Sequence, residues 1–195
     1  TTGMDALTHA VEAYIGGSTT KETRRMAEEA VHLIYQHLKA AYDNGQDKEA
    51  RSGMLKAAYC AGVAFTKSYV GYIHAVAHSL GGQYGIPHGL ANAVILPIVL
   101  RMYGPACEKK LARLAKKAGV VDRGMEDREA AACFIDWIQE MNDSMEIPEH
   151  LPEIQEEDIP VMAGHADREG NPLYPVPVLM DKKELEQIYW EVKGR

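Results

Sequence analysis

Residues 71–93 read GYIHAVAHSLGGQYGIPHGLANA. His74 and His78 lie four residues apart, so on a helix they share one face. The sequence Gly-Ile-Pro at 85–87 interrupts this helical pattern, and His88 stands at the start of the next apolar segment. The stretch therefore predicts two helices joined by a tight break, with one histidine placed where the break can aim it into a cleft.

Helical periodicity continues on both sides of this stretch. In the second expected helix, apolar residues recur in steps of three and four at Ala27, Val31, Ile34, Leu38 and Ala41, which marks one buried face. No segment alternates with period two for long enough to predict a strand, so the sequence predicts an all-α domain of roughly eight or nine helices, well above the usual helix fraction of about a third. Helices are expected over residues 3–14, 21–43, 47–67, 72–84, 89–102, 105–119, 126–142 and 181–192. Thr1 or Thr2 is expected to cap the first helix, and the third is expected to bury Met54, Leu55, Ala58, Ala61 and Phe65. Short helices are expected to start near Pro148 and near Glu156 or Glu157, and the proline-rich residues 171–177 are expected to form neither a helix nor a central strand.

Composition narrows the class of protein. The chain has 195 residues, of which 46% are hydrophobic and 25% are charged, as in ordinary globular domains. Its net charge of −7 argues against a nucleic acid or an anionic membrane as partner. The apolar run at 90–100 is interrupted by Asn92 and Pro97 and is too short to cross a bilayer. Three cysteines without CxxC spacing predict reduced thiols and a cytoplasmic location.

Two helices carry side chains at metal-ligand spacing. Asp5 and His9 lie four residues apart on the first expected helix, as His74 and His78 do on another. A divalent metal needs three or four N or O donors from different elements, and these helices together with His88 can supply them. The alternatives are ordinary: Asp5 can complement the helix dipole, and His9 can be a surface or a core histidine. HExxH is absent, which disfavours a zinc protease of that type.

The sequence resembles the iron-containing alcohol dehydrogenases in both regions that carry these residues. TTGMDALTHAVEAY at 1–14 is similar to the end of that family's first signature, and residues 71–91 are similar to its second. Phe65 and the Asn-Pro pair at 171–172 also agree with the family's C-terminal helical domain. The resemblance covers essentially the whole chain. It implies a single all-helical metal-binding domain over residues 1–195, of the iron-containing alcohol dehydrogenase or dehydroquinate synthase-like type.

The resemblance also implies roles for individual residues. In the family a Dx3H pair and two histidines fourteen residues apart bind one catalytic metal, usually Fe²⁺, although such a ligand set would hold Zn²⁺ at least as tightly. Glu12 matches a recurrent acid to which we can assign only a salt bridge or a cap. The implied metal ligands are Asp5, His9, His74 and His88, the implied proton relay beside the metal is His78, and the implied substrate-lining aromatic is Phe65.

One departure from the family concerns the nucleotide. Family enzymes carry an N-terminal α/β domain that binds NAD or NADP through a glycine-rich turn, and this sequence contains no Gly-x-Gly-x-x-Gly. The chain, which opens on Thr1 rather than Met, is therefore expected to be half of a two-domain enzyme and inactive alone.

Three functions follow as hypotheses. The first is the metal-binding domain of an alcohol dehydrogenase, whose partners are a small alcohol or aldehyde, the missing nucleotide domain and, as a further option, copies of itself. The second is a zinc-dependent domain like that of glycerol dehydrogenase or dehydroquinate synthase, which generally uses three protein ligands, so that His9 argues for iron. The third is a helical scaffold without metal chemistry.

Overall fold

The computed structural model describes residues 1–194 and contains helices and no strand within that range, which confirms the all-α prediction. The eight long helices expected are all present: 21–43 and 72–84 match at both ends, and the ends of the others differ by one or two residues. The elements in chain order are α1 (Thr2–Ile15), α2 (Lys21–Asp43), α3 (Lys48–Ser68), α4 (Tyr72–Tyr84), α5 (His88–Tyr103), α6 (Pro105–Ala118), α7 (Asp127–Ser144), the short 3-10 helix η1 (Glu156–Asp158), α8 (Ile159–Gly170) and α9 (Lys182–Lys193).

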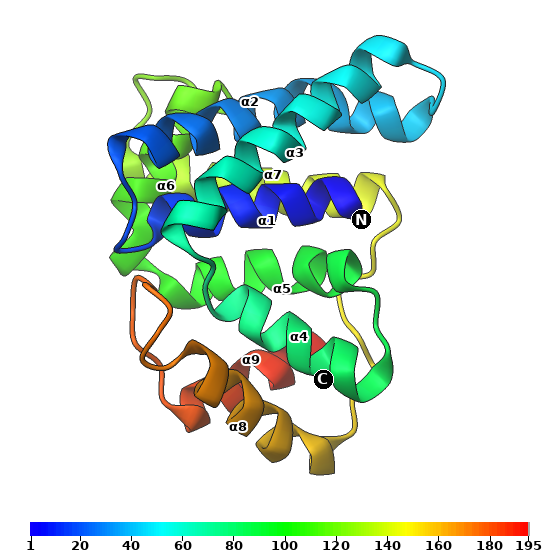
Figure 1. Cartoon of the computed structure of the whole chain (residues 1–195), viewed down its shortest axis with the longest axis vertical. Helices are drawn as coiled ribbons and strands as arrows, with labels where there is room; N and C mark the ends of the chain where they lie inside the picture. Colours follow the sequence, from blue (N-terminus) through cyan, green and yellow to red (C-terminus); the bar gives the residue numbers. More distant parts are fainter. Residues whose placement is uncertain (195) are drawn as a thin grey trace.

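The helices pack around a central helix, α5 (Figure 1). The antiparallel pair α2 and α3 covers α1, and α1 in turn packs on α5. On the other side of α5 lie α4 and α9, and α8 packs against both of them. Because α1, α4 and α5 meet in this way, the two sequence motifs are brought to one place.

Helix α5 is almost entirely buried, and its interior proline needs an explanation. Pro97 has no N–H, so the carbonyl of Ala93 loses the hydrogen bond that a helix normally gives it. The side chain of Asn142 on α7 donates Nδ2–H to this carbonyl over 2.7 Å and replaces the missing bond. A buried acceptor without a partner would cost about 1–3 kcal/mol. This contact therefore fixes α7 against the central helix.

One expectation about helix starts was wrong, and a second was confirmed in position only. No helix begins near Pro148: residues 145–155 form turns, and the N–H of Leu151 donates instead to the carbonyl of Val192 on α9 at 2.7 Å. Pro148 and Pro152 lie too close together for a helix between them to keep its hydrogen bonds. Thr1 is the N-cap residue of α1, but its side chain makes no capping hydrogen bond.

The buried face of α3 was also only partly predicted. Leu55 is 75% exposed and Ala58 is exposed, whereas Met54 and Phe65 are partly buried. The face that packs against α1 and α2 consists of small residues, because short side chains let three helices approach closely. Its buried members are Ala50, Ala57, Cys60, Ala61, Ala64 and Ser68.

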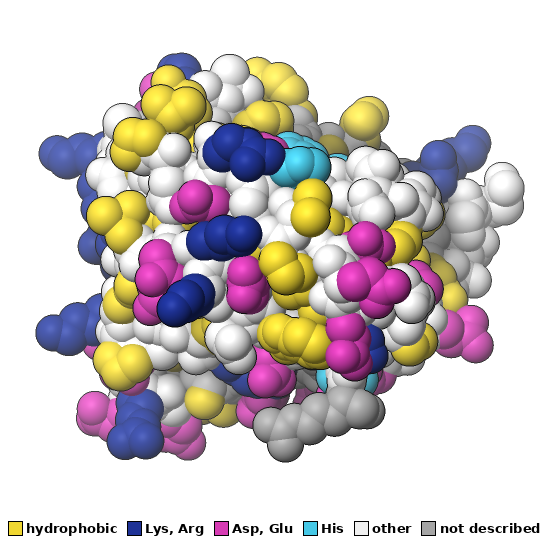
Figure 2. All heavy atoms as spheres, turned by 90° about the horizontal axis from the view of Figure 1, so that it is seen from below, with side chains coloured by type: hydrophobic (Ala, Val, Ile, Leu, Met, Phe, Trp, Pro, Cys, Tyr) yellow, Lys and Arg dark blue, Asp and Glu magenta, His cyan; other side chains and the backbone are white. Residues whose placement is uncertain are grey.

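The surface is mixed in charge, and the described helices offer no membrane span. On the face drawn in Figure 2, acidic and basic side chains alternate with small apolar groups. Within residues 1–194, no helix combines the length and the apolar character needed to cross a bilayer.

Candidate metal centre

The first ligand pair lies near the start of α1. Asp5 stands in the first turn of this helix and His9 one turn later, with Nδ1 of His9 3.8 Å from Oδ2 of Asp5. Both side chains are partly buried. The spacing read from the sequence thus places the two groups side by side on one helix face.

The other two predicted ligands come from α4 and α5. Gly85 adopts a left-handed conformation (φ 66°) at the end of α4, and the chain then turns back so that His88 is the first residue of α5. Oδ1 of Asp5 lies 3.3 Å from Nε2 of His88 and 3.8 Å from Nε2 of His74. Three elements therefore deliver one donor each to a single point.

The spacing of these donors suits a divalent ion. The ligand atoms of Asp5, His74 and His88 all lie within 4.8 Å of one another. With bonds of about 2.1 Å, tetrahedral donors around a metal lie roughly 3.4 Å apart. Small side-chain movements would close the group around an ion.

His9 lies beside this group but outside it. Its ring stacks on Phe65 with centroids 4.2 Å apart and lies 4.3 Å from the ring of His74. His9 does not join the three donors that converge within 4.8 Å. Its assignment as a fourth ligand stays a prediction, and Phe65 is placed at the edge of the cluster.

His78 is, with His88, one of the two exposed members of the histidine group. It lies one turn after His74 on α4, and its ring stacks on His88 with centroids 5.1 Å apart. Its side chain is 45% exposed, whereas that of His74 is 2% exposed. The structure therefore places it between the cluster and solvent.

Glu12 holds His74 in place, a role that the sequence reasoning did not find. This carboxylate is buried; Oε1 accepts a hydrogen bond from the N–H of Ile73 at 2.9 Å, and Oε2 lies 2.5 Å from Nδ1 of His74. A proton on Nδ1 leaves the lone pair of Nε2 directed at the donor group. A Cβ at Gly71 would lie 2.7 Å from Oε1, so glycine is needed there. The signal in the sequence was the position of Glu12, seven residues after Asp5 on the same helix face.

Asn92 was the second residue that the sequence reasoning missed. It is fully buried one turn after His88, and its Nδ2 lies 2.6 Å from Oδ1 of Asp5, 3.0 Å from Nε2 of His88 and 3.3 Å from Nε2 of His74. Its Oδ1 has no hydrogen-bond partner in the described part of the chain. Three acceptors thus surround one electropositive NH2 group, an arrangement that a cation also satisfies.

The electrostatics of the cluster favour metal binding over protonation. Burial, with His74 as a like-charged neighbour, lowers the pKa of His9 to about 4, and burial also lowers the pKa of His88. At neutral pH these imidazoles are uncharged and keep a free lone pair. One carboxylate and neutral imidazoles form a donor set suited to Fe²⁺ or Zn²⁺.

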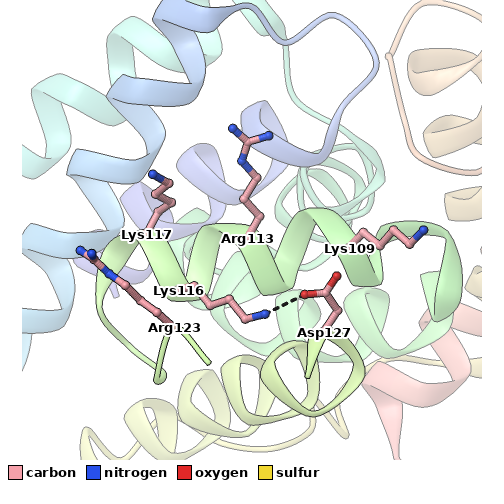
Figure 3. Close-up of a pocket in the computed structure, with 6 residues that line it drawn as sticks. All are labelled: Lys109, Arg113, Lys116, Lys117, Arg123 and Asp127. Atoms are coloured by element: carbon pink, nitrogen blue, oxygen red, sulfur yellow. Dashed lines mark hydrogen bonds and ion pairs between the residues drawn. The ribbon is translucent and has the colours of Figure 1, made fainter. Parts of the chain in front are cut away.

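A basic pocket elsewhere on the surface has a different chemistry (Figure 3). It encloses about 400 Å³ beside α6, and five of its six lining residues are cationic. Among residues 1–194, Lys116 is the one cation of this pocket with an ion-pair partner, Asp127 at 2.7 Å. Such a pocket attracts anions, and its lining residues include no metal-ligating histidine or cysteine. The lining residues are Lys109, Arg113, Lys116, Lys117, Arg123 and Asp127.

Comparison with known proteins agrees with the sequence motifs. The profile described as "Fe-containing alcohol dehydrogenase family, C-terminal" matches residues 1–192. The chain is 40% identical over 190 residues to the 1,3-propanediol dehydrogenase of Citrobacter freundii, covering 96% of this chain and 49% of that protein. It is 41% identical over 191 residues to alcohol dehydrogenase 4 of Saccharomyces cerevisiae, covering 96% and 48%.

Solved structures give the same result. A crystal structure of 1,3-propanediol oxidoreductase superposes with a TM-score of 0.90 at 40% identity, covering 96% of this chain and 50% of that one. The alcohol dehydrogenase of Oenococcus oeni superposes with a TM-score of 0.91 at 34% identity, covering 98% and 50%. The chain therefore spans about half the length of the relatives it matches.

Proposed function

Because the chain belongs to the iron-containing alcohol dehydrogenase family, where it matches the C-terminal domain, we propose that it is the metal-binding half of an NAD(P)-dependent alcohol dehydrogenase. The observation that carries this proposal is the convergence of Asp5, His74 and His88 on one point. The names of the relatives, 1,3-propanediol dehydrogenase and alcohol dehydrogenase 4, support a small alcohol or its aldehyde as substrate.

The proposed ligands are those three residues together with His9, and the proposed metal is Fe²⁺. A bound divalent ion would act as a Lewis acid on the oxygen of the alcohol or carbonyl group. Asn92 donates to the atoms that an ion would bind, so metal binding would displace its NH2 group from Nε2 of His74 and His88, while its contact with the Asp5 carboxylate could remain. Glu12 would fix the tautomer of His74.

The remaining steps use groups at the edge of the cluster. Phe65 provides an apolar wall against which the carbon chain of a substrate can pack. His78, which is exposed to solvent, would take the alcohol proton and pass it to water. Hydride would go to a nicotinamide ring held by a separate nucleotide-binding domain, since this sequence has no glycine-rich dinucleotide motif. The three cysteines are free thiols, which supports the proposed cytoplasmic location.

Metal binding by the chain tests the proposal directly. Anaerobically purified protein should bind Fe²⁺ or Zn²⁺ at one site, measured by elemental analysis and by calorimetric titration. His74→Ala should lose this binding, whereas His165→Ala, which removes an exposed histidine from α8, should keep it. Wild-type protein that binds no metal and unfolds at the same temperature with and without EDTA would instead support a helical scaffold.

The same chain should show no alcohol-dependent reduction of NAD⁺ or NADP⁺ by itself. Hydride transfer needs a nicotinamide held against the substrate, and this sequence contains no glycine-rich dinucleotide motif that would hold NAD⁺ there. The measurement is absorbance at the wavelength of NADH with a metal-loaded sample and excess 1,3-propanediol. Robust turnover would contradict the proposal that a separate domain binds the nucleotide.

A second candidate is a zinc enzyme with three protein ligands. The observation that favours it is the position of His9, which stacks on Phe65 outside the converging group. His9→Ala separates the two candidates: a loss of metal affinity indicates four ligands, and an unchanged affinity indicates three.

A further inference from the structure

A carboxylate on α8 reaches across to His78 on α4. Oε1 of Glu169 lies 2.7 Å from Nδ1 of His78, and the two residues are 91 positions apart in the chain. Within residues 1–194 no hydrogen bond is made by Nε2 of His78, and its ring is stacked beside His88. One ring nitrogen is thus hydrogen-bonded to a carboxylate, while the other makes no hydrogen bond in the described part of the chain, in a ring that lies beside the candidate ligand His88.

The packing of α8 on α4 makes this contact possible. A Cβ at Gly170 would lie 2.8 Å from the ring of the buried Tyr72, so only glycine allows the end of α8 to come this close. The hydroxyl of Tyr72 donates to Oδ1 of Asn171 at 2.6 Å and accepts from the N–H of Met180 at 3.1 Å. Both ends of the segment 171–180 are therefore anchored to Tyr72 of α4, and its first residue lies two positions after Glu169.

Tyr174 completes the arrangement. Its hydroxyl donates to Oε1 of Glu169 at 2.8 Å, and its N–H is bound to the carbonyl of Gly170 at 2.8 Å. Burial, with Glu169 as the neighbouring carboxylate, raises the pKa of Tyr174, so its proton stays on the phenol. Glu169 therefore accepts one hydrogen bond from Tyr174 and has room for one more, from a protonated Nδ1 of His78.

We propose that Glu169 is a positioning residue for His78. Its carboxylate holds the proton of the His78 ring on Nδ1 and leaves Nε2 as the atom that exchanges the alcohol proton. The inference rests on the proposed role of His78. In the oxidation direction the proton leaves the alcohol oxygen for Nε2, the imidazolium then carries a proton on each nitrogen, and water removes the proton from Nε2. Glu169 keeps its contact with Nδ1 and stabilises the imidazolium, as carboxylates beside catalytic histidines do.

The tautomer of His78 can be measured without metal, nucleotide or substrate. Long-range proton–nitrogen NMR correlation of the histidine rings distinguishes a proton on Nδ1 from one on Nε2. The metal-free 195-residue chain is studied at a pH about two units above the ordinary histidine pKa of about 6.5, where imidazoles are neutral. The signals of His78 are assigned from their loss in His78→Gln.

We expect His78 to carry its proton on Nδ1 in the wild type. In Glu169→Ala the ratio of Nδ1–H to Nε2–H should fall about tenfold or more, since a charge-assisted hydrogen bond is lost. Glu157→Ala, which removes an exposed carboxylate from η1, is the matched control and should change nothing. A contact that only packs α8 against α4, without a proton on Nδ1, would leave this ratio unchanged.

Two results would overturn the inference: an Nε2 proton on His78 in the wild type, or an unchanged tautomer in Glu169→Ala. The first result needs no variant, so it decides the matter even if a variant fails to fold. Titration of the same samples with Zn²⁺ keeps the two proposals separate, because Glu169→Ala should bind Zn²⁺ as tightly as the wild type. Failure of the wild type to bind Zn²⁺ would contradict the metal site and leave the tautomer result standing.

Discussion

Replacing Glu12 with glutamine keeps the shape of the side chain but changes what it offers to His74. The carboxylate accepts from the N–H of Ile73 through Oε1 and from Nδ1 of His74 through Oε2. Since the N–H of Ile73 can only donate, the amide oxygen in Glu12→Gln must face Ile73. The amide NH2 then faces His74, and Nδ1 must become an acceptor.

This exchange moves the proton of His74 to Nε2, the nitrogen 3.8 Å from Oδ1 of Asp5. A protonated Nε2 has no lone pair for a metal, so binding requires the ring to give up the new hydrogen bond. A charge-assisted hydrogen bond is worth about 1.5–3 kcal/mol, and removing an outer partner of a metal-binding histidine typically weakens metal affinity about 10–100-fold. We expect Glu12→Gln to weaken Zn²⁺ or Fe²⁺ binding by this factor, while the fold is retained.

The assay is calorimetric titration with Zn²⁺ at neutral pH, with urea unfolding of the same metal-free samples as a check on stability. Glu28→Gln is the matched control: it neutralises a half-buried carboxylate that accepts from Tyr14 at 3.0 Å and does not touch the histidines. It should bind metal like the wild type. If Glu12→Gln bound metal as tightly as the wild type, the reasoning from tautomer to affinity would be refuted.

Three further predictions concern stability and reactivity. Phe134→Ala removes a fully buried ring from α7 and should lower the free energy of unfolding by about 3–5 kcal/mol in urea titration, and a loss below about 1 kcal/mol would mean that the site collapses easily. Burial and the neighbouring His74 lower the pKa of His9 to about 4, so between about pH 6.5 and pH 4 the unfolded chain binds a proton at His9 that the folded chain does not bind. The free energy of unfolding of the metal-free protein should therefore fall by up to about 3 kcal/mol over this pH range. His9→Gln should make this pH dependence weaker. Burial raises the pKa of the Cys107 thiol to about 11, so at pH 8 a thiol reagent should label the half-buried Cys133 first and Cys107 only after unfolding.

Much of the fold could be predicted from local sequence because helices leave local signals. Apolar residues spaced three and four positions apart predicted α2, and glycine or proline marked the ends of α4, α5 and α6. The face of α3 could not be predicted in the same way. Large apolar residues such as Leu55 and Tyr59 lie on its exposed side, while small residues form its buried side. Packing against α1 and α2 selects the side with small residues.

The histidines and Asp5 could be named from the sequence because i and i+4 spacing on a helix fixes neighbours without knowledge of the fold. Their convergence could not, since it depends on how α1, α4 and α5 cross. Glu169 lies 91 residues from His78, and Asn142 lies 49 residues from the carbonyl that it satisfies; no local pattern connects either pair. Most helices and the candidate ligands follow from local sequence, because they depend on interactions within one or two turns. Which buried carboxylate holds His74 and which amide satisfies the carbonyl of Ala93 depends on packing, because a hydrogen bond between distant helices exists only after the helices have been brought together.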